Sequence, residues 1–345
     1  MVNAIFVILL WSISSIISLS SINKSTNSLK YYTVLSIIIF FVVTFRDGSS
    51  LNDYSNYIQL YIDSNRSTEV EPSFIYIKNI AHFLGGIFIL FLIYAFLCVF
   101  IKVIAIYRLT NLLFLTLVIY ISNIMILHDM TQIRAGVASG IFLYSIPYLA
   151  RQEKIKYLVS VLIATFFHYS GILFFLPCLF WINRIRISKW FYLLIIPIGY
   201  ILGGTIFDVS HFPIEHIRFK LEMYKNLQNA GVDGFTALNI FNPYIIFRIV
   251  LFYLLLWKRN IILSNNPYFS CLLFIEAIAI FVFPAFSSIA LLGYRGSELL
   301  GVVEIILYPM LYYIIKPKFW GKLSVIGIGG LLLVVNLTYK HLIYL

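Results

Sequence analysis

Long apolar runs, repeated along nearly the whole chain, constrain the fold of this sequence more than any other feature. A helix crosses the hydrocarbon core of a bilayer with about 20 apolar residues, and runs of that kind follow one another here between short polar breaks. Only 11% of the residues are charged and 61% are hydrophobic, whereas a soluble domain carries about 25% charged residues. We therefore expect an all-α integral membrane protein for which lipid is the main solvent.

The apolar runs predict one polytopic membrane domain over residues 1–345, a bundle with about 11–12 transmembrane segments. Spans of ordinary length are expected at residues 4–22, 31–45, 84–107, 112–127, 134–150, 190–207, 241–257, 267–283, 288–315 and 323–340. The cysteines lie inside such runs, so we interpret them as small core residues.

Residues 157–182 form an apolar segment with a basic cluster at each end. The clusters consist of Arg151, Lys154 and Lys156 on one side and Arg184, Arg186 and Lys189 on the other. If both clusters are cytoplasmic, the segment enters the membrane and returns as a half-crossing hairpin that turns near His168. Irregular backbone at that depth requires cover by protein or a water-filled cavity. We prefer this hairpin to a single tilted span.

The positions of the basic residues predict the orientation of the bundle. The net charge is +11, but most Lys and Arg lie in short loops between apolar runs, which indicates membrane orientation rather than a nucleic-acid partner. With the N-terminus outside, the inner loops are almost purely basic. Residues 46–83 and 208–240 then become two long extracytoplasmic loops that mix acids and bases. Loops of this length are commonly functional.

The first long loop holds the most informative polar residues. Arg46 lies where a span meets water, and Asp53, Tyr54 and Tyr57 fall within about one helical turn of one another. A carboxylate beside phenols in a cavity suits the activation of a sugar hydroxyl. The alternative is an ordinary interfacial boundary with no chemistry. Glu71 follows later in the same loop.

A second polar cluster contains His128, Gln132 and Arg134 at the outer end of the fourth span. If the next helix begins near Thr131, Arg134 lies in its first turn, where a guanidinium and the positive helix end together form an anion site. The alternative for Arg134 is an interfacial anchor. His168 lies at the expected hairpin turn, where it is either a packing residue or a group that faces a cavity.

The late spans carry further ionisable residues. Glu276 and Glu304 lie in the middle of apolar runs and need a partner or a proton. Arg248 can supply that partner as a structural ion pair. Arg295 and Glu298 are spaced for pairing along one helix.

No metal or cofactor site is expected. The run from His211 to His216 resembles a zinc-hydrolase pattern, but it is one residue too long and contains Pro213. The sequence has no Walker loop, dinucleotide fingerprint or Asp-x-Asp motif, so a nucleotide-sugar donor is not indicated.

Three groups of residues, taken in order, carry a family resemblance. They are Phe45-Arg46-Asp47-Gly48 with Asp53-Tyr54, Tyr57 and Glu71-Pro72, then Met130-Thr131-Gln132-Ile133-Arg134 with Ala138, and finally Ala164 with Phe167-His168-Tyr169-Ser170. This combination resembles the EpsG-like group of bacterial polysaccharide polymerases, which are relatives in function of the Wzy O-antigen and capsule polymerases. The motifs cover residues 40–180, and the length and span count match over the whole chain.

The resemblance implies a glycosyltransferase of polysaccharide or lipopolysaccharide biosynthesis in the bacterial inner membrane, with its active site facing the periplasm or cell exterior. It would transfer a growing glycan from undecaprenyl pyrophosphate to a lipid-linked repeat unit. The expected partners are the lipid-linked donor and acceptor, membrane lipid and a chain-length regulator. Inversion at the anomeric carbon and independence of metal are also expected, with arginines stabilising the pyrophosphate.

On this interpretation the catalytic residues are Asp53, His168 and Arg134, with Asp53 the first choice of base and His168 the second. The expected substrate-binding residues are Arg46, Tyr54, Tyr57, Glu71, His128, Gln132, Arg248, Arg295 and Glu298. The alternative functions are a flippase for a lipid-linked oligosaccharide and a membrane O-acetyltransferase. Polar residues concentrate on one side of the membrane, which favours an enzyme over a transporter. The inner loops are too short to build the coenzyme site that an acetyltransferase needs.

Overall fold

The structure of the protein is a computed structural model. It describes residues 2–20, 24–63, 70–180, 187–203, 222–223, 225–231 and 238–343. Helices account for most of this described part, which contains no β-strand apart from one isolated bridge between Leu51 and Ile343. The expected all-α fold is therefore confirmed.

Seven helices in the described part are long and apolar enough to cross a membrane. They are α1 (Val2–Ser20), α2 (Thr26–Thr44), α5 (Ile87–Leu109), α6 with η3 (Leu113–Ile119 and Tyr120–Thr131), α7 (Ile133–Ala150), the run α15 to α17 (Ala290–Leu300 to Leu311–Ile314), and α18 with η8 (Lys318–Val334 and Val335–Tyr339). Each of them corresponds to one of the spans predicted from the apolar runs, so a multi-pass membrane protein is confirmed.

Shorter apolar helices complete the bundle. They are η4 with α9 (Tyr169–Phe174 and Phe175–Phe180), α10 (Lys189–Ile201), α12 (Pro243–Trp257) and α14 (Phe269–Ala285), and a short helix α13 (Arg259–Leu263) follows α12. They occupy the other predicted spans, although part of 190–207 and most of 208–240 lie outside the described residues. The total of about 11–12 crossings depends on these shorter helices and stays a prediction.

The chain turns sharply at His168. Helix α8 (Lys154–Phe167) ends there, because His168 has an extended backbone with φ −153° and ψ 120°. The hydroxyl of Tyr157 in α8 donates a hydrogen bond of 2.5 Å to the carbonyl of Phe174 in η4, so the two segments lie side by side. At Gly171 a Cβ atom would lie 3.0 Å from the backbone of Ala164, which explains a glycine at this close approach. The turn of the expected hairpin is present, and its depth in the membrane stays a prediction.

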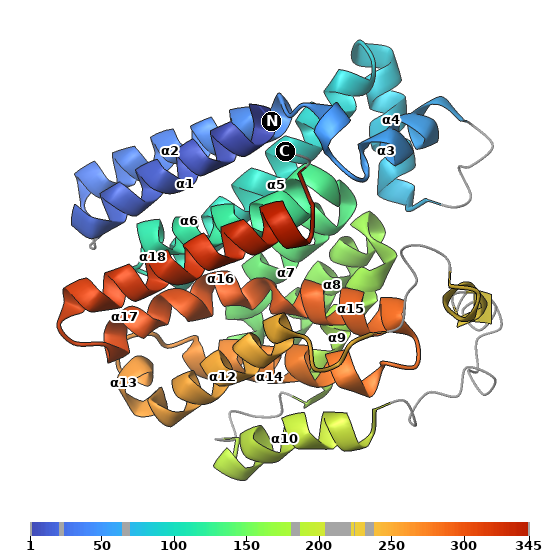
Figure 1. Ribbon diagram of the computed structural model, residues 1–345. Coiled ribbons are helices and arrows are strands. Elements are labelled where there is room, and N and C mark those ends of the chain that lie inside the picture. Colours follow the sequence, from blue (N-terminus) through green and yellow to red (C-terminus); the bar gives the residue numbers. More distant parts are fainter. Residues whose placement is uncertain are drawn as a thin grey trace.

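Both ends of the described chain lie beside the first long loop (Figure 1). The side-chain amide of Asn3 donates to the carbonyl of Asp47 at 2.7 Å, and the amide N–H of Asp47 donates back to Asn3 at 2.9 Å. Near the other terminus, the side-chain amide of Asn52 donates to the carbonyl of His341 at 3.3 Å. The N-terminus, the C-terminal segment and the first loop therefore share one end of the bundle.

Basic residues of the short loops gather at the opposite end. Lys24 donates to the carbonyl of Tyr107 at 2.5 Å, and Arg151 donates to the hydroxyl of Tyr268 at 3.2 Å. These contacts join segments that are far apart in the sequence. The positive-inside rule predicts that this end faces the cytoplasm.

The described residues of the first long loop include two helices that cover the other end of the bundle. Helix α3 (Tyr54–Ile62) and helix α4 (Pro72–Leu84) lie close to each other at the upper right of Figure 1. Pro72 occupies the first turn of α4, where its missing N–H costs nothing. Phe74, fully buried, packs its ring near Tyr57 and Tyr94 and so fixes α4 against both α3 and α5. This anchoring holds Glu71 over the bundle.

Candidate active site

Glu71 joins three segments that are distant in the sequence. Its side chain is 3% exposed at the N-cap position of α4. One carboxylate oxygen, Oε1, accepts hydrogen bonds from His168 Nδ1 at 2.8 Å and from the backbone N–H of Tyr169 at 3.2 Å. The other oxygen, Oε2, forms an ion pair with Arg134. The hairpin turn, the start of α7 and the start of α4 are therefore tied together by one carboxylate.

The electrostatics keep Glu71 ionised. Burial alone raises the pKa of this carboxyl, but the hydrogen bond from His168 and the charge of Arg134 outweigh it and lower the pKa to about 2. An ionised carboxylate only accepts hydrogen bonds, so His168 Nδ1 is the donor in this pair. In the neutral imidazole, Nε2 is then left as a proton acceptor. The arrangement orients a base of the kind that acid–base catalysis uses.

Arg134 is the second residue of α7, as the sequence predicted for a helix that begins near Thr131. Its guanidinium lies over the rings of Tyr57 and Phe74, at 5.6 Å and 5.8 Å from their centroids. Its Nε is buried and has no hydrogen-bond partner among the described residues. The positive end of α7 adds to this charge. Gln132 precedes the helix at its N-cap position.

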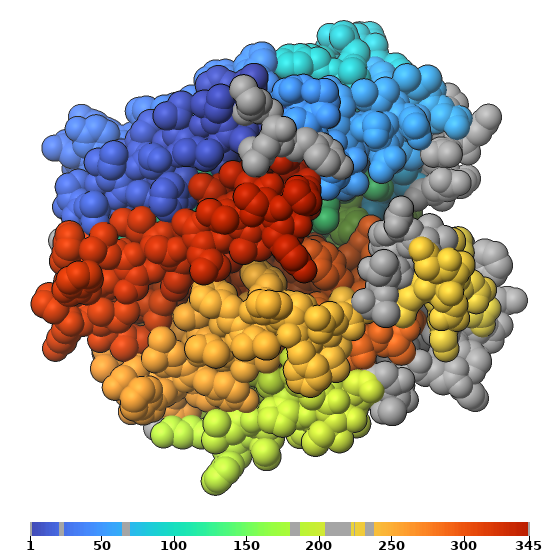
Figure 2. All heavy atoms as spheres, in the orientation of Figure 1, coloured from blue at the N-terminus to red at the C-terminus, as the bar shows by residue number. Residues whose placement is uncertain are grey.

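Asp53 belongs to the same electrostatic site. It occupies the N-cap position of α3, yet its side chain makes no capping hydrogen bond. Burial raises the pKa of the Asp53 carboxyl, while the positive charges of Arg295 on α15 and of Arg134 act in the opposite direction. Arg295 is exposed and forms no ion pair within the described part of the chain. It is therefore the cation of the site that is most open to an anionic substrate. In Figure 2, orange and green atoms are set back between the blue first loop and the red C-terminal segment, where these elements meet.

Tyr54 and Arg46 both contact the ring of Phe91. The ring of Tyr54 stacks on Phe91 with centroids 4.7 Å apart, and the guanidinium of Arg46 lies 4.5 Å from the centroid of the same ring. Tyr57 meets Phe91 edge-on at 6.4 Å. Contacts therefore run from Arg46 to Phe91, from Phe91 to Tyr57, and from Tyr57 to Arg134.

His128 was expected at the site, but the structure does not place it there. Its side chain is fully buried, and its Nδ1 lies 3.1 Å from Ser139 Oγ in α7. The reason is that the whole helix from Leu113 to Thr131 is enclosed by its neighbours, so no face of it opens to the outer surface. His128 is a core histidine in this structure.

Arg248 is also interior, and here the alternative interpretation of the sequence is confirmed. Its NH2 lies 3.1 Å from Glu276 Oε1, its Nε lies 2.5 Å from Glu304 Oε1, and its NH1 donates to Ser297 at 2.8 Å. The side chain is 3% exposed. Two carboxylates and one guanidinium thus form a buried ion-pair cluster, as the alternative interpretation expected. The expected contact of Arg248 with substrate stays a prediction.

The expected pairing of Arg295 with Glu298 is not seen among the described residues. Glu298 instead lies 3.9 Å from the Nζ atom of Lys340. Lys340 follows η8 and comes from the far end of the sequence, and sequence spacing gives no sign of that contact. Glu298 is therefore tied to the C-terminal segment.

Sequence reasoning also missed two features. The backbone N–H of Tyr169 helps to hold Glu71, and no side-chain identity reveals a backbone donor. Lys102, fully buried, contacts Asp129 Oδ1 at 2.6 Å, and Tyr120 donates to Asp129 Oδ2 at 2.5 Å. A lone lysine inside an apolar run was a usable signal for such a pair.

Among the residues that the structure describes, no group of three or more His, Cys, Asp or Glu side chains is placed to hold a metal ion. The run from His211 to His216 lies outside the described residues. Independence of metal remains a prediction.

The fold and the site define a polytopic α-helical membrane protein with a carboxylate, an imidazole and arginines gathered at one end of the bundle. The chain belongs to the EpsG family, whose match covers residues 29–344. Membership of this family suggests a polysaccharide polymerase-like function and associates the chain with glycosyltransferase-like polymerases. No curated protein matched the sequence, and no solved structure matched the fold.

Proposed function

We propose that this protein is an O-antigen or capsule polysaccharide polymerase at the outer face of the bacterial inner membrane. It transfers a glycan from undecaprenyl pyrophosphate to the non-reducing end of a lipid-linked repeat unit. The reaction inverts the anomeric carbon by direct displacement and uses no metal ion. The proposal rests on the family and on the chemistry of the residues around Glu71.

The observation that carries the proposal is the double contact of Glu71 with His168 and Arg134. In the reaction, the acceptor hydroxyl attacks the anomeric carbon, and the bond from that carbon to the pyrophosphate oxygen breaks. The hydroxyl proton passes to His168 Nε2, and undecaprenyl pyrophosphate leaves. Glu71 orients the imidazole and stabilises the imidazolium that forms.

The leaving pyrophosphate requires a positively charged side chain that no carboxylate of the protein already neutralises. Arg134 shares its charge with Glu71, whereas Arg295 forms no ion pair in the described part of the chain and is exposed. We assign Arg295 to the pyrophosphate and Arg134 to holding Glu71 and adding to the positive field. A guanidinium suits this role because its planar fork binds oxyanions at two points. The charges of both arginines act on the Asp53 carboxyl, and we assign Asp53 to orienting the acceptor hydroxyl.

The test is reconstitution with purified protein and lipid-linked repeat units, with product length read on a gel. The unchanged protein should give a ladder of longer lipid-linked glycans. Glu71→Gln should give little or none, because the amide neither holds His168 as firmly nor pairs with Arg134. Glu153→Gln is the matched control, since Glu153 pairs with Lys156 at the opposite end of the bundle. Movement of repeat units across vesicle membranes without any joining would identify a flippase instead.

A further inference from the structure

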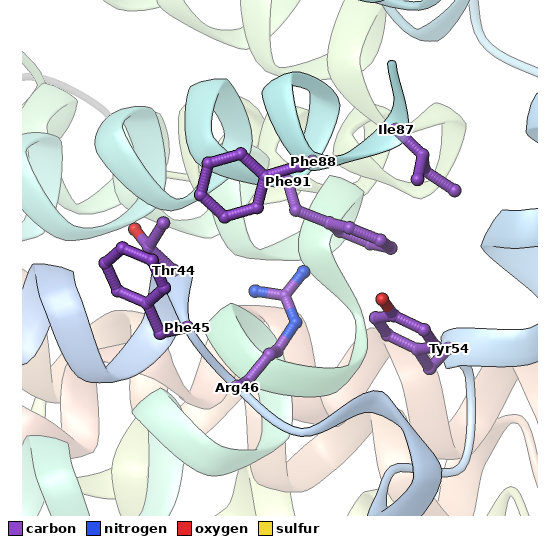
Figure 3. A pocket seen from close by; sticks show the side chains of 7 residues that line it. All are labelled: Thr44, Phe45, Arg46, Tyr54, Ile87, Phe88 and Phe91. Atoms are coloured by element: carbon purple, nitrogen blue, oxygen red, sulfur yellow. The ribbon is translucent and has the colours of Figure 1, made fainter. Parts of the chain in front are cut away.

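A cavity of about 220 Å³ opens beside the end of α2 and the start of α5 (Figure 3). Arg46 lies inside it, and the ring of Phe91 forms one wall. Tyr54 forms another wall, with its hydroxyl turned toward the guanidinium in Figure 3. Phe45 and Phe88 also line it.

The guanidinium of Arg46 is buried without a full set of partners. The residue is 7% exposed. NH1 donates to the carbonyl of Val43 at 2.8 Å and more weakly to that of Asp129 at 3.4 Å. Nε and NH2 are buried and have no hydrogen-bond partner among the described residues. Unpaired buried donors are costly, and charged ones more so, so an acceptor in the cavity would relieve this cost.

Among the described residues, an aromatic ring and backbone carbonyls meet the charge of Arg46, and no carboxylate pairs with it. The carboxylate of Asp129 is already bound by Lys102 at 2.6 Å, and no carboxylate in the described part of the chain forms an ion pair with Arg46. Burial lowers the pKa of Arg46 to about 10, so the guanidinium keeps its charge at neutral pH. The interior of the cavity therefore favours an anion.

The mouth of the cavity is apolar. Phe45 is 67% exposed and Phe88 is 44% exposed, and their ring centroids are 5.6 Å apart. They lie where α2 ends and α5 begins, that is, where two membrane-spanning helices reach the interface. An apolar rim around a cationic interior suits an amphiphile with an anionic head and an apolar chain.

We propose that this cavity binds the phosphate group of a membrane lipid, with two-point contact to Arg46 and with the lipid chain passing Phe45 and Phe88 into the bilayer. The bound group is a phosphate or pyrophosphate ester of a long apolar alcohol. Free pyrophosphate shares the headgroup chemistry but does not use the apolar rim.

The position of the cavity gives it a role in the reaction, and this step rests on the proposed function. A polymerase must hold two lipid carriers, one that is released and one that remains attached to the product. The cavity adjoins the site, because Phe91 contacts Arg46, and Tyr57, which meets Phe91 edge-on, contacts Arg134. Tyr54 lines the cavity, and the charges of Arg295 and Arg134 act on its neighbour Asp53. The Arg46 cavity therefore holds the carrier of the acceptor, whose sugar extends past Tyr54 toward Asp53.

The test is photo-crosslinking of the full-length protein in detergent with a diazirine-tagged undecaprenyl pyrophosphate, followed by peptide mapping. The adduct should map to the end of α2 and the start of α5. Arg46→Gln should weaken labelling there by about 10- to 100-fold, as expected for loss of charged hydrogen bonds. Lys30→Gln is the matched control, because it removes one positive charge from the exposed opposite end of the same helix. Unchanged labelling in Arg46→Gln would overturn the assignment.

Two further arms separate the sources of the phosphate and guard against misfolding. Inorganic pyrophosphate should compete poorly with untagged undecaprenyl pyrophosphate, and equal competition would reduce the cavity to a site for a free anion. Phe88→Ser changes an exposed residue, so the fold should persist while labelling falls. Full labelling in Phe88→Ser would contradict the lipid route.

The outcome is independent of polymerase activity. Glu71→Gln should abolish the glycan ladder and leave crosslinking at the cavity unchanged. If the unchanged protein makes no polymer but still labels through Arg46, the proposed function fails and the lipid site stands. If polymer forms but Arg46→Gln does not change the labelling, the proposed function stands and the lipid site at Arg46 is wrong.

Discussion

The carboxylate of Glu71 accepts a hydrogen bond of 2.8 Å from His168 Nδ1 across 97 positions of sequence. Glu71 begins a helix of the first loop, and His168 ends a helix of the hairpin. Because Arg134 binds the other oxygen of the same carboxylate, the first loop is docked onto the bundle through the residues that we assign to chemistry. The contacts of Glu71 that dock the loop therefore also orient the imidazole of His168.

This coupling gives a pH prediction with a defined sign. The pKa of Glu71 falls from an ordinary value of 4.5 to about 2, because the hydrogen bond from His168 and the charge of Arg134 outweigh burial. A carboxyl with a lowered pKa adds stability above its unfolded value and loses that stability as the pH falls through its folded value. The contribution of Glu71 should thus be complete above pH 4.5 and should be lost toward pH 2.

The effect can be measured as the change in unfolding temperature in detergent as the pH is lowered from neutral through 4.5, the ordinary pKa of a glutamate, toward the lowered pKa of Glu71, about 2. In Glu71→Gln, the unfolding temperature should depend less on pH in the acidic part of the range. In Glu153→Gln, it should depend on pH as it does in the unchanged protein, because Glu71 is still present. Identical curves for Glu71→Gln and the unchanged protein would show that the carboxylate is not ionised as described.

Much of the fold could be predicted from the sequence, because long apolar runs identify the membrane-spanning helices. The predicted span 134–150 became α7 (Ile133–Ala150), and the predicted break near His168 became the end of α8. The first loop was less accessible to sequence analysis. Its two helices, α3 and α4, are short and amphipathic, and their packing depends on burial against α5 rather than on any local pattern.

The sequence predicted which residues belong to the site, but it did not predict which of them contact one another. Glu71 was expected to bind substrate, but its partners lie 63 and 97 positions away, and only the tertiary fold brings them together. His128 was placed at the site because its neighbours are polar. It is buried because the helix that carries it is surrounded on every side. Partner choice and side-chain direction are set by packing, which one sequence does not display.

Topology can be checked at Lys189. If the hairpin enters and leaves from the cytoplasmic side, residue 189 is cytoplasmic, as the basic cluster around it predicts. In a cysteine-free background, Lys189→Cys should resist a membrane-impermeant maleimide added to intact spheroplasts. Asn56→Cys in the exposed part of α3 should react. Reaction of both positions from outside would mean that residues 157–182 cross the membrane once.

The cluster around Arg248 predicts a stability effect rather than a binding effect. Removing the guanidinium leaves Glu276 and Glu304 buried without their partner, and breaking a buried pair in this way costs about 3–5 kcal/mol. Arg248→Met should lower the unfolding temperature in detergent markedly. Adding Glu276→Gln and Glu304→Gln should recover part of the loss, because the uncompensated charges are then gone. A stable Arg248→Met protein with poor substrate affinity would restore Arg248 as a binding residue.

Metal dependence separates arginine from a divalent cation as the source of charge. If Arg295 and Arg134 stabilise the leaving pyrophosphate, polymerisation should continue in excess EDTA at an unchanged rate. The measurement is the initial rate of ladder formation after the protein and the lipid substrates have been treated with chelator. Loss of activity that magnesium or manganese restores would contradict the assignment of the charge to arginine.

The identity of the base is the most direct question about the chemistry. The sequence favoured Asp53, whereas the structure shows that the carboxylate of Glu71 orients His168. His168→Gln should lower turnover by about 10²–10⁴-fold, the usual cost of losing a general base. Asp53→Asn should cost about 10-fold, as expected for a hydrogen bond to substrate. His82→Gln is the control, since His82 contacts Tyr61 in the same loop.

The double variant Glu71→Gln with His168→Gln measures how far the effect of Glu71 on turnover depends on His168. If Glu71 acts only through His168, the double variant should lose no more turnover than His168→Gln alone, because residues that work as a unit are not additive. Additive losses would mean that Glu71 also serves the reaction through Arg134. If Asp53→Asn is instead the deeper defect and His168→Gln is mild, the base is Asp53. The contact of His168 with Glu71 would then serve to dock the first loop onto the bundle.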